Sequence, residues 1–181
     1  MKKRVLVCSE FSQLATGYST YGKELLNRLS KYSEIECAEF GCYAEDGDSK
    51  IYEQPWKVYP NCPNRNNQEE MNRYNSDFSN AFGKYRFESV VNDFKGHILI
   101  DFRDPWMNSY INESPLRRFF NYNWMIPCDS YPVHEEVIDC LSQCDGVMTY
   151  TDWSRKIVEK QGIKVYGFIS RCIKLFDYIK T

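Results

Sequence analysis

Residues 5–29 place a strand, a polar loop and a helix in immediate succession. Val5, Leu6 and Val7 form a continuous apolar run, which is typical of a strand buried on both faces of a parallel sheet. In the helix that follows, apolar side chains recur at intervals of three and four residues, so one side can pack on the sheet. The loop containing Gly17 begins at the carboxyl edge, where ligands bind in such sheets. The segment therefore predicts an α/β domain with a ligand site at its first loop.

Gly17, Tyr18 and Ser19 begin this helix and are the first candidate substrate-binding residues. Backbone N–H groups in a first helical turn have no partner inside the helix, and Gly17 allows a ligand to approach the backbone closely. An anion or a sugar hydroxyl fits such a site. The alternative is that Gly17 only makes a tight connection, because the chain contains neither a GxGxxG motif nor a P-loop.

Strand and helix patterns alternate along the rest of the chain. Strand patterns follow at 35–40, 56–59, 98–100, 124–126, 146–148 and 164–169. Helix patterns lie at 68–94, with a possible break at Gly83, at 133–141, at 151–160 and from about 171 to 181. Right-handed crossovers turn this order into a doubly wound parallel sheet of six or seven strands. We expect residues 1–181 to form a single Rossmann-like three-layer domain with a mostly parallel sheet, helices on both faces and an irregular excursion at about 42–67.

Polar side chains directly follow three of these strands. Asp101 and Arg103 follow the strand at 98–100. Asp129 and Tyr131 follow the strand at 124–126, and Thr151 follows the strand at 146–148. Carboxyl ends of parallel strands meet at one edge, so we expect these residues to line that edge and bind substrate. A solvated charge cluster is the alternative for Asp101 and Arg103. For Asp129 the alternative is a cap on the next helix or the formation of a turn.

Composition narrows the classes of function. With 181 residues, of which 43% are hydrophobic, the chain can bury one core and is short for two ordinary domains. A net charge of −2 and a pI near 5.8 argue against a nucleic-acid partner. No apolar run is long enough for a transmembrane segment or for the core of a signal peptide. We expect a cytoplasmic protein, for which peripheral membrane contact remains open.

The chain has 8 cysteines and no CxxC pair, so reduced and mostly buried thiols are expected. Cys140 and Cys144 are one helical turn apart, with His134 earlier on the same segment, but no second ligand pair has a recognisable spacing. We therefore expect no metal and no cofactor. A cysteine-based or metal-dependent enzyme is the least favoured function.

Two segments resemble the amino-terminal domain of family 4 glycosyltransferases, which have the GT-B architecture. One is residues 8–29, CSEFSQLATGYSTYGKELLNRL. The more specific one is residues 126–169, IPCDSYPVHEEVIDCLSQCDGVMTYTDWSRKIVEKQGIKVYGFI. Within it, residues 129–132 match the family's Asp-Gly-Tyr-Pro-like turn, with Ser130 in place of the glycine. The likeness covers roughly half of the chain and is loose at 42–94.

The resemblance implies retaining transfer of a sugar from a nucleotide-activated donor to an acceptor, between two Rossmann-like domains. The amino-terminal domain receives the acceptor and the carboxy-terminal domain holds the donor. We therefore expect this chain to bind a sugar or glycan acceptor, and a nucleotide-sugar donor to require a second domain or chain. The sequence ends at Thr181, about where the resemblance places the donor-binding domain. We therefore expect that this chain lacks the donor-binding domain and is inactive without it.

Asp129 and Arg103 are the candidate catalytic residues. Asp129 can hydrogen-bond an acceptor hydroxyl or receive its proton. Arg103 and the Gly17 loop are the local groups able to stabilise a leaving diphosphate. The alternative function is a non-catalytic Rossmann-like or flavodoxin-like association module, which would expose a large apolar patch and have no nucleotide-sugar cleft.

Overall fold

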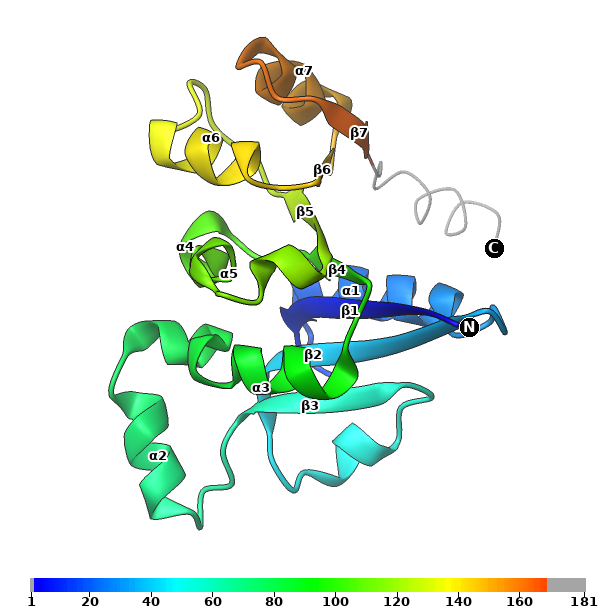
Figure 1. Ribbon diagram of the computed structural model, residues 1–181, viewed down its shortest axis with the longest axis vertical. Helices are drawn as coiled ribbons and strands as arrows, with labels where there is room; N and C mark the ends of the chain where they lie inside the picture. Colours follow the sequence, from blue (N-terminus) through cyan, green and yellow to red (C-terminus); the bar gives the residue numbers. More distant parts are fainter. Residues whose placement is uncertain (1, 169–181) are drawn as a thin grey trace.

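The computed structural model describes residues 2–168. Within this range, seven parallel strands form one sheet in the order β3-β2-β1-β4-β5-β6-β7 (Figure 1). Their bounds are β1 Lys3–Glu10, β2 Ile35–Glu45, β3 Lys57–Cys62, β4 Ile98–Asp101, β5 Asn121–Ile126, β6 Gly146–Thr149 and β7 Val165–Phe168. The predicted doubly wound parallel sheet is confirmed. The order of the strands reverses between β1 and β4.

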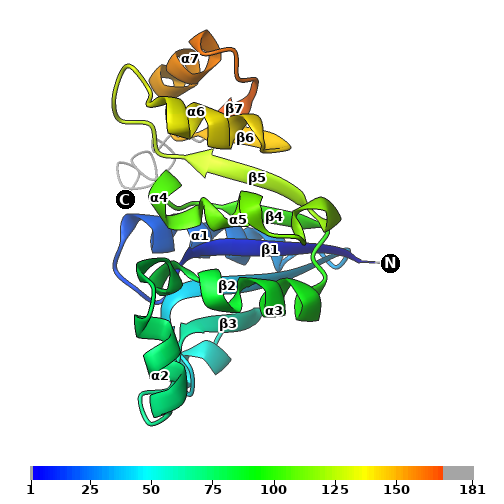
Figure 2. The ribbon, with the colours of Figure 1, turned by 60° about the vertical axis from the view of Figure 1, so that its left-hand side comes forward.

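Helices cover both faces of this sheet. The α-helices are α1 Gly17–Leu29, α2 Gln68–Asn75, α3 Lys84–Phe94, α4 Pro105–Asn108, α5 Tyr110–Glu113, α6 Glu135–Ser142 and α7 Asp152–Lys160. Three short 3-10 helices are η1 Ser49–Tyr52, η2 Phe78–Phe82 and η3 Arg117–Phe119. Helix α1 lies on one face of the sheet, and α3 and α5 lie on the other (Figure 2). The predicted three-layer, Rossmann-like arrangement is confirmed.

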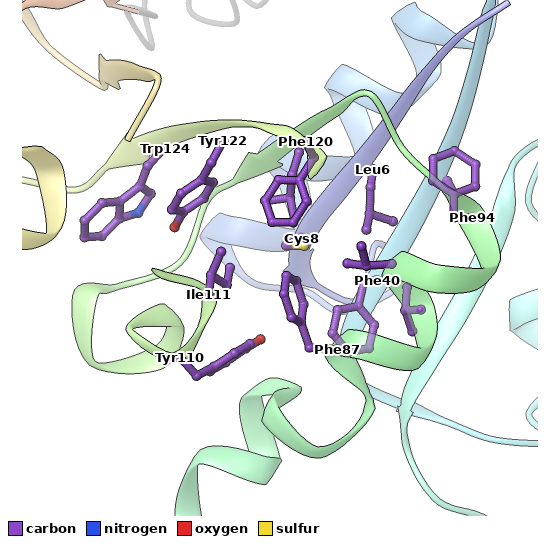
Figure 3. Close-up of a cluster of buried hydrophobic side chains, with 14 of the residues drawn as sticks. Leu6, Cys8, Phe40, Phe87, Phe94, Tyr110, Ile111, Phe120, Tyr122 and Trp124 are labelled. Carbon is purple, nitrogen blue, oxygen red and sulfur yellow. The ribbon is translucent and has the colours of Figure 1, made fainter. Parts of the chain in front are cut away.

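The core is divided by the sheet because successive side chains of a strand point to opposite faces. On β1, Val5 and Val7 pack in the cluster that includes Leu26 of α1. Leu6 and Cys8 face the other way, into a larger cluster with side chains from β2, α3, α5 and β5 (Figure 3). Both faces of the central strand are therefore buried, as its continuous apolar run predicts.

The structure bears out one detail of the sequence expectations and corrects another. The helix pattern at 68–94 is broken as anticipated at Gly83, whose φ of 109° separates η2 from α3. The irregular excursion at 42–67 is wrong at its start, because β2 continues to Glu45, whereas β3 at Lys57–Cys62 bears out and lengthens the strand predicted at 56–59 within it. A shift in the β2–β3 register between Gly41 and Glu45, with Tyr43 at a φ of 66°, interrupts the alternation from which a strand is read.

The final helix expected up to residue 181 lies outside the described residues. Among residues 2–168, no helix combines the length and apolar character needed to cross a membrane.

Candidate functional site

A cleft of about 750 Å³ opens at the carboxyl edge of the sheet. Its walls come from the end of β1, the first turns of α1, the loop after β5 and the segment from β6 into α7. In doubly wound sheets the ligand crevice forms where the strand order reverses, and here β1 lies at that reversal. The lining residues are Glu10, Thr16, Gly17, Tyr18, Tyr21, Pro127, Cys128, Asp129, Tyr150, Thr151, Trp153 and Ser154.

Aromatic rings form much of the cleft surface. The rings of Tyr21 and Tyr150 pack edge to face with centroids 4.8 Å apart, and Tyr21 also stacks on Phe102. The Tyr150 hydroxyl donates a hydrogen bond to the Phe102 carbonyl at 3.3 Å, and burial raises the pKa of that hydroxyl. Trp153, by contrast, is 51% exposed. The cleft thus combines two fixed rings with one that can cover a ligand.

Tyr18 is a polar group of the cleft with a defined orientation. Its hydroxyl donates a hydrogen bond to Asp104 Oδ1 at 2.8 Å. Burial, followed by this hydrogen bond and the charges of Asp104 and Glu10, raises the pKa of Tyr18 well above its ordinary value. The phenol therefore stays protonated at neutral pH, and its oxygen can accept a hydrogen bond from a ligand hydroxyl.

The charged groups in the cleft are carboxylates. Glu10 ends β1, and Asp129 lies exposed in the loop after β5. Among the described residues, neither carboxylate has an ion-pair or side-chain hydrogen-bond partner, and no Lys, Arg or His lines the cleft. Ionised carboxylates only accept hydrogen bonds, so this site suits a ligand rich in hydroxyl donors and disfavours a phosphate.

Thr151 and Ser154 hold one wall of the cleft in place. The Thr151 hydroxyl accepts a hydrogen bond from the Ser154 N–H at 3.0 Å and caps α7. The Ser154 hydroxyl donates to the Cys128 carbonyl at 2.9 Å. This bond ties the start of α7 to the loop that carries Asp129.

The structure brings four of the predicted site residues together and separates the other four. Gly17, Tyr18, Asp129 and Thr151 line the cleft, whereas Ser19, Asp101, Arg103 and Tyr131 do not. Ser19 is fully buried and forms the capping box of α1 with Thr16. Tyr131 is 63% exposed outside the cleft lining.

Asp101 and Arg103 form an ion pair in the interior. The charges satisfy each other, as the alternative to a ligand role has it, but both side chains are 0% exposed, so the cluster is not solvated. The carboxylate also accepts hydrogen bonds from the Arg103 backbone N–H at 2.8 Å and from Nε at 3.0 Å. The guanidinium donates further to the Phe82 carbonyl and, at 3.0 Å, to the Tyr110 hydroxyl. Neither side chain has exposed surface through which a ligand could contact it.

Asp129 does not cap the next helix, so the capping alternative is wrong. The residue at the N-cap of α6 is His134. Sequence reasoning did not select Glu10, Thr16, Tyr21 or Tyr150. Glu10 is the last residue of β1, and its position at the carboxyl end of the first strand is the signal that could have identified it.

The seven cysteines within the described range are free thiols, and three of them, Cys8, Cys37 and Cys42, are buried. Over the same residues, no group of three or more His, Cys, Asp or Glu side chains is placed to hold a metal ion.

The strand order and the cleft define a Rossmann-like α/β domain with a crevice at the carboxyl edge of its sheet. Solved structures place it more narrowly, as the fold of the amino-terminal domain of GT-B proteins. The chain is similar to the apo form of the lipopolysaccharide outer core galactosyltransferase WaaB, with a TM-score of 0.55 and 14% identity over 90% of this chain and 43% of that one. It is also similar to the UDP-GlcNAc 2-epimerase from Methanocaldococcus jannaschii, with a TM-score of 0.54 and 10% identity over 93% of this chain and 45% of that one. A third similar structure is the UDP-GlcNAc 2-epimerase from Neisseria meningitidis bound to UDP-GlcNAc, with a TM-score of 0.53 and 11% identity over 93% of this chain and 46% of that one.

This chain spans less than half the length of each of these structures. No protein-family model and no curated protein matches it. The resemblance to GT-B proteins is therefore confirmed at the level of the fold, and the similar structures do not single out family 4 within that fold.

Proposed function

We propose that this chain binds a sugar or glycan acceptor, as the amino-terminal domain of a GT-B-type glycosyltransferase does. The observation that carries the proposal is the composition of the cleft, where, within residues 2–168, Glu10 and Asp129 lie unpaired beside aromatic rings and no cationic side chain lines the walls. Sugar hydroxyls donate to carboxylates, and the apolar faces of sugar rings pack on aromatic side chains. A nucleotide diphosphate would instead meet two negative charges.

The roles of individual residues follow from their positions. Asp129 is exposed in the loop after β5 and serves as the acceptor of a hydrogen bond, or of the proton, from the reacting hydroxyl. The Tyr18 oxygen and the first turn of α1, at Gly17, orient the rest of the sugar. Arg103 is fully buried, so the diphosphate of a donor has to be stabilised by groups other than this guanidinium. Transfer itself requires a nucleotide-sugar held by a second domain or chain.

Saturation-transfer NMR on the purified chain tests the proposal. The ligands are simple glycans, nucleotide-sugars and free nucleotides, and the variants are Gly17→Val and Asp129→Asn. Asp139→Asn is the matched control, because Asp139 is an exposed aspartate on α6 that does not line the cleft. We expect glycan signals from the wild type and the control, and their loss in both cleft variants.

Other results would overturn parts of the proposal. Binding of nucleotide-sugars without glycans would assign the cleft to a donor instead. Binding of nothing, together with concentration-dependent self-association, would favour the association module. Robust sugar transfer by this chain alone would refute the requirement for a second domain.

A further inference from the structure

A group of four aromatic side chains, three exposed and one buried beneath them, lies near the cleft. We call it the aromatic platform and define it as Tyr43, Phe78, Phe82 and Trp106. Phe78 is 72% exposed, Trp106 is 57% exposed and Tyr43 is 44% exposed. These residues come from β2, η2 and α4, so folding brings them together from distant parts of the sequence. Contiguous exposed apolar surface of this kind marks a binding site more often than isolated exposed residues do.

Buried contacts fix the geometry of the platform. The rings of Phe78 and Trp106 are nearly parallel, at 17°, with centroids 6.0 Å apart. Phe82 is 3% exposed and meets both rings edge-on, with centroids 5.2 Å from Phe78 and 4.9 Å from Trp106. The Phe82 carbonyl accepts hydrogen bonds from Arg103 and Tyr110 in the interior. The two exposed rings therefore rest on a rigid base and keep their orientation without a ligand.

Tyr18 joins the platform to the cleft. Its side chain lines the cleft and also packs against the cluster formed by Cys42, Phe82 and Met107. Its hydroxyl bonds to Asp104, the N-cap residue of α4, two positions before Trp106. Tyr18 therefore contacts both the cleft and the buried base of the platform, and we treat the cleft, Tyr18 and the platform as one candidate surface at the carboxyl edge of the sheet.

We propose that this surface binds an extended oligosaccharide, with one end of the glycan in the cleft and the following sugar rings passing Tyr18 onto Phe78 and Trp106. The inference rests on the proposed function and specifies its acceptor as a chain of several sugars. The electrostatics suit an uncharged, hydroxyl-rich ligand. Carboxylates of the cleft lie at one end, and at the other end Asp77, the residue before Phe78, is neutralised by an ion pair with Lys84 at 2.9 Å. Flat exposed rings supply apolar faces for successive sugars.

The chain has four tryptophans, and their positions allow each part of the surface to be observed separately. Trp56 and Trp124 are buried, at 5% and 1% exposure, whereas Trp106 lies in the platform and Trp153 in the cleft. The Trp153→Phe variant leaves Trp106 as the exposed tryptophan, and Trp106→Phe leaves Trp153. Acrylamide quenching of each variant then reports which region a sugar covers. The probes are linear gluco- and chito-oligosaccharides from the monosaccharide to the hexasaccharide.

We expect short sugars to protect Trp153 alone and the longest sugars to protect both tryptophans. Calorimetry should show that hexasaccharide binds about tenfold more tightly than disaccharide, and that Trp106→Ala or Phe78→Ala removes this gain while disaccharide binding is unchanged. Phe78 is the more exposed of the two, which guards against a loss caused by misfolding. Phe119→Ala is the control, because Phe119 is 64% exposed just before β5, at the opposite edge of the sheet.

The two levels of the proposal fail in different ways. If Trp153 is protected equally by sugars of every length while Trp106 remains open to quenching, the extended site is overturned and the acceptor cleft stands. If no sugar protects Trp153, the proposed function falls and the extended site falls with it. Protection of Trp106 by raised protein concentration or by lipid vesicles, without sugar, would overturn the glycan as occupant of the platform.

Discussion

Replacing Asp101 with asparagine tests whether the buried ion pair is a major element of stability. The carboxylate accepts hydrogen bonds from the backbone N–H, Nε and a terminal nitrogen of Arg103. Burial by itself lowers the pKa of Arg103, but the charge of Asp101 and the other polar neighbours raise it well above its ordinary value. The guanidinium therefore remains charged in the interior. After the substitution, its partners are the neutral amide, the Phe82 carbonyl, the Tyr110 hydroxyl and the Cys42 thiol.

The expected cost follows from the burial of both partners. Removing one member of a buried ion pair destabilises a protein by about 3–5 kcal/mol, and both of these side chains are 0% exposed. The total free energy of unfolding of a single domain is about 5–15 kcal/mol. Asp101→Asn should therefore remove a large share of the stability, seen as a lower urea midpoint when unfolding is followed by tryptophan fluorescence.

A double variant separates the loss of the pair from the burial of a lone charge. In Asp101→Leu with Arg103→Met, no charge is left in the interior, so we expect a smaller loss of stability than in Asp101→Asn. Neither position lines the cleft, so the folded double variant should bind a disaccharide in the cleft as the wild type does. A loss below about 1 kcal/mol in Asp101→Asn would refute the reasoning on stability. Loss of glycan binding in a stably folded double variant would restore a direct role for Arg103.

Three further substitutions, at Glu39, Gly83 and Gly162, test the packing of the domain. Burial raises the pKa of Glu39 above its ordinary value of 4.5, so its contribution to stability is complete below that value and is lost as pH rises through the raised pKa. In urea titrations across this pH range, the free energy of unfolding should fall more steeply for the wild type than for Glu39→Gln. Parallel pH dependences would contradict the raised pKa. A Cβ at Gly83, where φ is 109°, would lie 2.5 Å from Phe40 Cε1, whereas Gly162, at a φ of 83°, has open space. Gly83→Ala should thus cost about 2–5 kcal/mol and Gly162→Ala about 1–2 kcal/mol, and equal midpoints on thermal denaturation would refute the steric argument.

The fold could be predicted from the sequence because its signals are local. Apolar runs such as Val5 to Val7 and residues 98–100 mark buried strands, and a three- to four-residue period marks α1. The end of β2, after Gly41, could not be predicted in the same way. A register shift there, with Tyr43 at a positive φ, breaks the alternation on which the prediction of a strand depends. Only tertiary pairing with β3 shows that the strand continues.

The site could be predicted only in part, because position at a strand end does not fix the direction of a side chain. Asp101 lies two residues after Leu99 on β4 and so points to the same face, into the interior, where it pairs with Arg103. The alternation along the strand contains that information. Asp129 instead lies beyond the end of β5, in a loop where the alternation no longer applies, and it reaches the cleft.

The carboxyl edge of the sheet therefore contains both a buried ion pair, Asp101 with Arg103, and an open crevice. The reversal of the strand order explains where each lies. The connection after β1 leads to α1 on one face of the sheet, and the connection after β4 leads to α4 and α5, of which α5 packs on the other face. Diverging connections leave a crevice at the reversal. Arg103 stabilises the β4 side of it from within, by holding the Phe82 carbonyl beneath the aromatic platform. Because the Arg103 guanidinium is paired with Asp101 in the interior, it does not reach the crevice. The crevice presents carboxylates and aromatic rings, and this lining favours a sugar acceptor over an anionic donor.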